Sequence, residues 1–257
     1  MLTVISPAKK LDFEGVPLKL DATEPAFQAD AYSLSRTARR LSVADLQKLM
    51  SISSALAKLN QARFKDFAEA PTPEQVKPAA LAFNGDTYTG LQADTLSADD
   101  LAYAQNHLRI LSGLYGLLRP MDNIQPYRLE MGSRLATRRG KTLYQYWGTR
   151  IAEAINEVET DTLLNCASVE YFSVIKPEAL TPKVITPVFM ELRDGKAKIV
   201  SFFAKKARGM MARYAVQNQI ENPEDLKSFT HGGYCFQPTE SSDTKLVFTR
   251  AYPDTTP

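Results

Sequence analysis

Apolar and polar positions follow two different patterns along this chain. Short, unbroken apolar runs between turn residues predict buried strands, whereas apolar residues three and four apart predict amphipathic helices. The predicted strands are 2–5, 80–83, 162–165, 184–190, 198–203 and 245–250. The predicted helices are two or three within 26–69, and single helices at 97–111, 143–158 and 205–219.

The order of these elements favours a single mixed α/β domain over residues 1–257. Strands and helices alternate only in part, and the sequence contains no internal repeat and no heptad array. A chain of 257 residues is long enough to bury a sizeable core. With 44% apolar and 23% charged residues, its composition is that of an ordinary globular protein. The order of the strands in the sheet stays open.

Nothing in the apolar pattern indicates a membrane protein or a secretory leader. No apolar run approaches the roughly 20 residues that cross a bilayer, and the first residues lack a basic lead before a long apolar core. The two cysteines, Cys166 and Cys235, lie far apart, which argues against a disulfide scaffold or a zinc site. We therefore expect a cytoplasmic protein with no membrane contact.

Charge is unevenly distributed, although the net charge is only +2. Residues 109–150 contain eight basic and two acidic residues, a net charge of +6. Residues 196–213 contain six basic residues and no acidic one. Basic regions on an otherwise acidic body are the electrostatic footprint of a polyanion-binding protein. We expect the two stretches to line one basic cleft; the alternative is two separate solvated faces.

The stretch Arg109–Pro120 has the composition of a phosphate-binding turn. Gly113 is placed to end the predicted helix 97–111, because glycine accepts a left-handed backbone. Gly116 follows three residues later, so the tight turn Gly113-Leu114-Tyr115-Gly116 could direct its backbone N–H groups at a phosphate oxygen. The alternative is an ordinary helix turn that stops at a glycine.

Six blocks of sequence, in order, resemble the YaaA family of bacterial peroxide-stress proteins. The most specific is Leu111–Pro120, which is followed by Pro126–Gly132. The other five blocks are Ile5–Lys9, Phe83–Leu91, Leu143–Gly148, Asn165–Ser168 and Ala204–Gly209. Together they extend over nearly the whole chain.

The resemblance implies a cytosolic single-domain protein of peroxide stress that binds DNA in a positively charged cleft. It also implies a helix-hairpin-helix-like element, here at about residues 101–125, of the kind that holds the DNA backbone without reading bases. Pro120 follows so soon after Gly116 that the second helix must be short or broken. The expected DNA contacts are Arg109, Gly113, Leu114, Tyr115, Gly116, Arg119, Arg128, Arg134, Lys205, Lys206, Arg208 and Arg213.

The basic segment Ala204–Arg213 is expected to open a helix. Cations near a helix N-terminus oppose the helix dipole, so their presence there favours an anionic partner over a solvated face. We expect DNA, duplex or branched, as that partner, with no cofactor and no obligate protein partner.

The same cleft could instead be the active site of an enzyme acting on a nucleotide or another phosphorylated small molecule. Lys9 and Asp86 each follow a predicted strand, and strand ends of α/β sheets line clefts. Asp86 could pair with Glu130 or Lys9 in acid/base or metal chemistry, or it could simply satisfy the amides of a turn. The lining residues would be Lys9, Asp86, Tyr88, Tyr127, Arg128 and Glu130. No residue is assigned a catalytic role, and the sequence favours a protein without enzymatic activity.

Metal and redox chemistry find little support in the sequence. His107 and His231 are isolated, so we predict no metal site. We interpret Cys166 as a small buried apolar residue and not as a reactive thiolate that senses peroxide.

Overall fold

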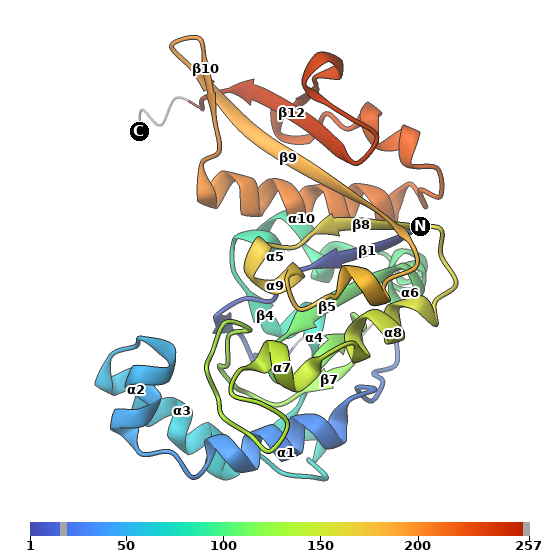
Figure 1. Cartoon of the computed structure of the whole chain (residues 1–257). Helices are drawn as coiled ribbons and strands as arrows, with labels where there is room; N and C mark the ends of the chain where they lie inside the picture. The colour runs from blue at the N-terminus through green and yellow to red at the C-terminus, as the bar shows by residue number, and fades with distance from the viewer. Residues whose placement is uncertain (16–19, 254–257) are drawn as a thin grey trace.

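A mostly parallel sheet of eight strands runs through the middle of the protein (Figure 1). The computed structural model describes residues 1–15 and 20–253, so residues 16–19 and 254–257 of the expected domain lie outside the described residues. The sheet has the order β11-β12-β9-β8-β1-β5-β6, and β10 pairs with β9. Its strands are β1 (Leu2–Ile5), β5 (Leu108–Ser112), β6 (Gly116–Leu118), β8 (Thr162–Cys166), β9 (Lys183–Arg193), β10 (Lys196–Lys198), β11 (Cys235–Phe236) and β12 (Lys245–Ala251). The prediction of a single mixed α/β domain is confirmed.

Two short strand pairs and a set of helices surround this sheet. β2 (Lys10–Leu11) pairs with β4 (Phe83–Asn84), and β3 (Lys77–Pro78) pairs with β7 (Asn123–Ile124). The α-helices are α1 (Gln28–Ala38), α2 (Val43–Met50), α3 (Ser54–Asp66), α4 (Ala79–Ala82), α5 (Asp86–Leu91), α6 (Ala98–His107), α7 (Leu143–Trp147), α8 (Arg150–Asn156), α9 (Val169–Phe172) and α10 (Ser201–Gln217). Short 3-10 helices occur at Pro73–Gln75, Ala93–Thr95, Pro177–Ala179, Pro223–Ser228, His231–Gly233 and Pro238–Glu240.

The strand order brings distant parts of the chain to one edge of the sheet. β1 lies between β5 and β8 and is parallel to both. The chain reaches β5 through α6 on one face, then passes back to β8 by way of α8, which lies with α9 on the other face (Figure 1). Neighbouring parallel strands whose connections diverge in this way leave a crevice at their carboxyl ends, where α/β proteins bind ligands. In this protein that rule points to the carboxyl ends of β1 and β8, and we call this candidate ligand site the crevice.

The central strands are buried along their length because helices cover both faces of the sheet. All four residues of β1 are buried, as are the last four of β8. Continuous apolar runs are typical of parallel strands that are covered in this way. For this reason the short apolar runs predicted β1, β8 and β12 correctly.

Helices α5 and α10 cross with their backbones in direct contact. A Cβ atom on Gly209 would lie 1.8 Å from the carbonyl oxygen of Thr87, and one on Gly90 would lie 2.1 Å from that of Lys206. No residue with a side chain fits at such distances. Because α10 also contacts β1, β8 and β9, the crossing fixes both helices against the sheet.

The predicted helix-hairpin-helix element is wrong. The helix expected over 97–111 ends at His107, and residues 108–112 form β5, which pairs with β1. The chain then turns back as β6, antiparallel to β5, so the region 101–125 contains a β-hairpin in place of a helical one. Helical spacing of the leucines could not reveal this outcome, because pairing with a distant strand decides it.

Three other element predictions are also wrong in part. Residues 79–82 form helix α4, as a run rich in alanine favours, and only Phe83 begins a strand. The strand expected over 198–203 stops at Lys198, and α10 starts at Ser201. The helix expected over 143–158 is divided at Gly148, whose φ of 55° is left-handed.

Replacing Gly209 by alanine should destabilise the protein strongly. We expect the Gly209→Ala variant to lose about 3 kcal/mol or more of unfolding free energy, since overpacking costs about 1–3 kcal/mol even where only side chains collide. Urea unfolding followed by circular dichroism measures this loss. Gly15→Ala is the control, because a Cβ atom there meets nothing within 4 Å. Equal stability of the two variants would contradict the close crossing.

Candidate functional site at the carboxyl ends of the strands

Hydrogen bonds between serines join the ends of β1 and β8. The backbone N–H of Ser168 donates to Oγ of Ser6 over 2.8 Å, and the Ser6 hydroxyl lies 3.3 Å from that of Ser168. The hydroxyl of Tyr88, from α5, donates to the carbonyl oxygen of Ser6 over 3.3 Å. Ser168 also caps α9 by accepting from the backbone N–H of Tyr171. The crevice therefore has a fixed polar floor.

Arg208 lies beside this floor without a polar partner. It is partly buried, close enough to Cys166 at the end of β8 for their charges to interact, and it makes no hydrogen bond or ion pair with any described residue. Burial lowers the pKa of Arg208, and the Cys166 thiol opposes that shift. Arginine nevertheless stays charged at physiological pH. A partly buried cation without an anion is unfavourable in an isolated protein, so this position favours an anionic ligand.

Lys9, Arg128 and Glu130 form a second charged group. One carboxylate oxygen of Glu130 accepts from Nζ of Lys9 at 3.1 Å and from Nη2 of Arg128 at 3.0 Å. Nε of Arg128 is buried and has no hydrogen-bond partner among the described residues. The structure thus brings together Lys9 and Glu130, one of the pairs that the sequence suggested. Asp86 joins neither of them: it is exposed in the first turn of α5.

Three buried tyrosines lie near this charged group. Burial raises the pKa of Tyr88, Tyr127 and Tyr171 well above the usual value, and their mutual interactions raise those of Tyr88 and Tyr171 further. A hydrogen bond of 2.6 Å between the hydroxyls of Tyr127 and Ser112 only partly offsets the effect on Tyr127. These phenols stay neutral near physiological pH, so they can donate hydrogen bonds but cannot act as bases.

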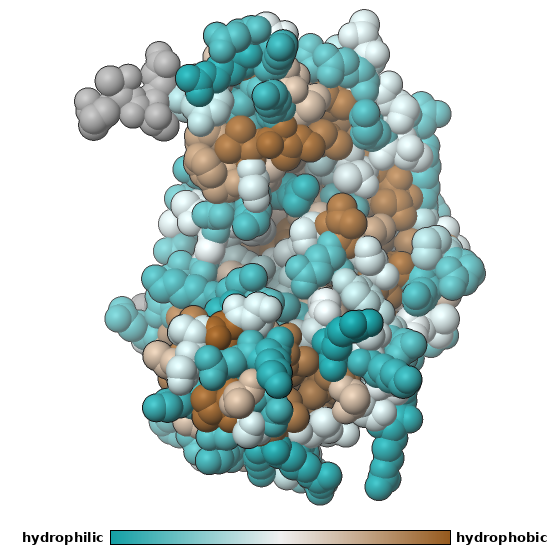
Figure 2. Space-filling model, turned by 60° about the vertical axis from the view of Figure 1, so that its left-hand side comes forward, coloured by the Kyte–Doolittle hydropathy of each residue, from teal (hydrophilic) through white to brown (hydrophobic). Residues whose placement is uncertain are grey.

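The first turns of α10 add exposed positive charge next to the crevice. Lys205 and Lys206 are both exposed, and the first turn of the helix contains no acidic residue. Figure 2, which brings the carboxyl ends of the strands toward the viewer, shows a hollow across this face, with polar side chains around much of it and an apolar band above it. We call Lys205, Lys206 and Arg208 together the α10 basic group.

The predicted phosphate-binding turn is not at the surface. Gly113, Leu114, Tyr115 and Gly116 are all buried, and the backbone N–H of Tyr115 donates to Oγ of Ser112. The Trp147 side chain donates to the Gly113 carbonyl, and a Cβ atom on Gly116 would lie 2.8 Å from the Trp147 ring. These glycines therefore serve close packing in the core, and their backbone is not accessible to DNA.

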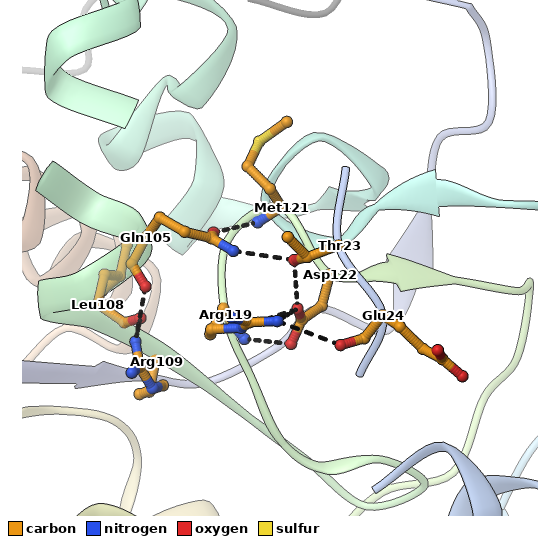
Figure 3. A network of polar contacts seen from close by, with 8 residues as sticks. All are labelled: Thr23, Glu24, Gln105, Leu108, Arg109, Arg119, Met121 and Asp122. Carbon is orange, nitrogen blue, oxygen red and sulfur yellow. Dashed lines mark hydrogen bonds and ion pairs between the residues drawn. The ribbon is translucent and has the colours of Figure 1, made fainter. Parts of the chain in front are cut away.

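Arg109 and Arg119 belong to an internal polar network (Figure 3). Arg109 donates to the carbonyl oxygens of Gln105 and Leu108, and burial lowers its pKa to about 10. Arg119 forms an ion pair of 3.0 Å with the buried Asp122 and also donates to the Glu24 carbonyl. Arg109 therefore joins the end of α6 to β5, and Arg119 holds the loop after β6 in place.

The two remaining predicted contacts differ from each other. Arg213 donates to the carbonyl oxygens of Leu91 and Gln92 and to the Thr95 hydroxyl, so it fastens the end of α5 to α10. Arg134 is exposed and makes no ion pair with a described residue. Of the twelve expected contacts, only Arg128, Arg134 and the α10 basic group keep charge that a ligand could use.

Sequence reasoning missed the role of the serines and of Tyr171 in this crevice. Ser6, Ser112 and Ser168 each stand at or just after the end of a buried strand. That recurring position was the available signal, because the ends of parallel strands converge. Tyr171 carried no such signal, since only the packing of α9 on the sheet brings it there.

Within residues 1–15 and 20–253, no group of three or more histidine, cysteine or acidic side chains is arranged to hold a metal ion. None of the described helices is long and apolar enough to span a membrane.

The fold defines a class: a mixed α/β protein with a large, mostly parallel sheet covered by helices. The chain belongs to the family described as peroxide stress protein YaaA, whose family model matches residues 1–240. The family predicted from the six sequence blocks is confirmed.

Relatives of similar length are named UPF0246 proteins. One from Dinoroseobacter shibae is 59% identical over 261 residues, covering 100% of this chain and 97% of the relative. Others from Roseobacter denitrificans and Ruegeria pomeroyi are 57% and 56% identical, each covering 98% of this chain and 99% of the relative.

Cys166 should be inert toward thiol reagents in the folded protein. Burial raises its pKa to about 12, although the charge of Arg208 opposes the shift, and its side chain is buried. We expect iodoacetamide at mildly alkaline pH to modify only the exposed Cys235, and to modify both cysteines once urea unfolds the chain. Mass spectrometry of tryptic peptides distinguishes these results. Rapid modification of native Cys166 would restore the peroxide-sensor interpretation.

Proposed function

We propose that this member of the peroxide-stress family is a cytoplasmic protein that binds DNA through its backbone phosphates, largely without sequence preference. The observation that carries the proposal is Arg208, a partly buried guanidinium group that has no hydrogen-bond or ion-pair partner among the described residues and lies beside the exposed Lys205 and Lys206. Arginine and lysine groups of this kind supply the electrostatic part of DNA affinity, which does not depend on sequence.

The position of these cations on α10 supports a phosphate ligand. α10 begins at Ser201 and not at the basic segment, so these cations lie beyond its first turn, and their own charge, not the helix dipole, is what favours an anion. The backbone crossing at Gly209 holds this turn rigidly next to the ends of β1 and β8. Arg128 and Arg134 are further contacts in this proposal, and the basic cleft would extend from them to the α10 basic group.

Bound along the DNA backbone, the protein would protect DNA from oxidative damage, in keeping with the family to which the chain belongs. In this proposal it needs no cofactor and no obligate protein partner. The partner DNA is duplex or branched, because phosphate contacts alone do not require a particular sequence.

Charge reversal on α10 should abolish salt-sensitive DNA binding. We expect the Lys205→Glu, Lys206→Glu double variant to bind a labelled duplex or branched DNA at least tenfold more weakly than wild type at physiological salt. Arg208→Gln should make the plot of log affinity against log salt less steep by about 0.9, the contribution of one phosphate contact. Fluorescence anisotropy at several salt concentrations measures both effects.

The matched control is Lys183→Glu with Lys245→Glu. Both lysines are exposed. They are the first residues of the parallel strands β9 and β12, so they lie at the amino ends of the strands, opposite the carboxyl ends where the candidate site lies. This variant has the same net charge as the α10 variant and should keep most of the affinity. If both double variants lose binding equally, only overall charge matters and the α10 site is refuted.

A second candidate function is an enzyme that acts on a nucleotide or another phosphorylated small molecule in the same crevice. The observation that favours it is the compact group around Glu130, where Arg128 keeps a buried donor without a partner and neutral tyrosine hydroxyls lie close by. Small-molecule sites typically combine a few convergent polar groups with buried aromatic side chains. Lys9, Asp86 and Tyr127 would be the other lining residues.

Arg128→Gln separates the two candidates. If the crevice serves a small phosphorylated ligand, this variant should bind a nucleoside monophosphate at least tenfold more weakly, while Lys205→Glu with Lys206→Glu should bind it almost normally. Calorimetric titration gives both affinities. Undetectable nucleotide binding by wild type, together with salt-sensitive DNA binding, would exclude the enzyme.

A further inference from the structure

A second basic site lies away from the strand ends, between α1 and the loop 136–140. The two walls enclose a pocket of about 610 Å³, within the range of about 300–1,000 Å³ that ligand pockets commonly have. Figure 1 shows this loop descending from the sheet to lie beside α1. Its lining residues are Ala29, Asp30, Ser33, Arg36, Thr37, Arg40, Ala136, Thr137, Arg138, Arg139 and Tyr146.

One face of α1 supplies the first wall. Ser33, Arg36 and Thr37 lie three and four residues apart within α1, so they share a side of the helix, and Arg40 follows shortly after the helix ends at Ala38. Arginine near a helix C-terminus stabilises the helix dipole, which accounts for part of this arrangement. It does not account for Arg138 and Arg139, which face the same pocket from the loop.

The only carboxylate of the pocket is already neutralised. Oδ1 of Asp30 accepts from Arg139 at 2.7 Å, from Arg150 at 2.8 Å and from the hydroxyl of Tyr146 at 2.7 Å. Burial alone would raise the pKa of Asp30, but the hydrogen bonds from Tyr146 and Arg150 and the charges of Arg150 and Arg139 outweigh it and lower the pKa. Asp30 therefore stays ionised and holds the two walls together.

Three arginines of the pocket have no anion of their own. Arg36, Arg40 and Arg138 are exposed and form no ion pair with any described residue. Two alanines and the covered ring of Tyr146 are the only apolar lining residues, so the pocket offers little to an apolar ligand. Hydroxyl groups of Ser33, Thr37 and Thr137 add hydrogen bonds. Planar guanidinium groups and hydroxyls are the donors that fit phosphate oxygens best.

From this geometry we propose that the pocket between α1 and the loop 136–140 binds a chain of two or three phosphates. Converging arginines on opposite walls match several linked phosphates better than a single small anion. Inorganic polyphosphate and the phosphate chain of a nucleotide share this chemistry. The site is separate from the α10 basic group, and the proposal does not depend on DNA binding there.

The test is calorimetric titration of the full chain with sodium tripolyphosphate at physiological salt. We expect wild type to bind it, and Arg36→Gln with Arg40→Gln to bind at least tenfold more weakly. Arg138→Gln, a change on the opposite wall, should also weaken binding. The matched control, Lys183→Gln with Lys245→Gln, removes the same charge from exposed positions outside both sites and should leave the affinity within about twofold, because distant positions behave independently.

Titrations with other ligands show whether the pocket recognises a nucleotide or the phosphate chain alone, and whether the proposal is wrong. A nucleoside triphosphate that binds more tightly than tripolyphosphate identifies a nucleotide site, whereas equal affinity identifies the phosphate chain alone. Sulfate that binds as tightly as tripolyphosphate, no binding by wild type, or equal loss in the control with Lys183 and Lys245 replaced would overturn the proposal. Displacement of tripolyphosphate by DNA would also overturn it, since the pocket would then belong to a DNA surface.

Discussion

The contact between the backbones of α5 and α10 is the constraint on which the candidate site depends. Gly90 and Gly209 allow the two helices to touch where any side chain would collide with a carbonyl oxygen. This contact carries Tyr88 and Arg208, from segments far apart in the sequence, to the end of the same pair of strands. The serines that join β1 to β8 then complete a rigid floor. The site is thus preorganised by packing, which lowers the cost of ordering groups when a ligand binds.

The protein uses many of its arginines to hold its own structure together. Arg109, Arg119 and Arg213 bind carbonyl groups or a buried carboxylate, and Arg139 and Arg150 neutralise Asp30. What distinguishes the candidate ligand sites is therefore the presence of cations whose hydrogen-bonding capacity is left unused. A basic stretch in a sequence shows only that cations are present, because the partners that decide their role come from elsewhere in the fold.

Two groups of such cations are the α10 basic group and the arginines of the pocket beside α1. In our proposals the first, at the carboxyl ends of the strands, binds an extended phosphate backbone, and the second, which lines a pocket, binds a compact chain of phosphates. A protein of the peroxide-stress family that carries both sites would be able to bind DNA and a smaller phosphate ligand separately. The internal Asp30 cluster and the α5–α10 crossing belong to different parts of the chain, so neither site requires the other.

Local sequence was enough to predict the buried strands β1, β8 and β12, two or three helices where α1 to α3 lie, the mixed α/β class and the family. The strands, the helices and the fold class follow from local apolar patterns, and the family follows from the six sequence blocks. Both signals can be recognised without knowing any tertiary contact. Only the tertiary structure decided that residues 108–118 form a β-hairpin, because Leu108 to Ile110 pair with β1, about a hundred residues away. It also decided that Gly113 and Gly116 pack in the core against Trp147, and that Arg213 donates several hydrogen bonds while Arg208 makes none with a described residue. Burial and pairing depend on which distant atoms surround a residue, and no local pattern contains that information.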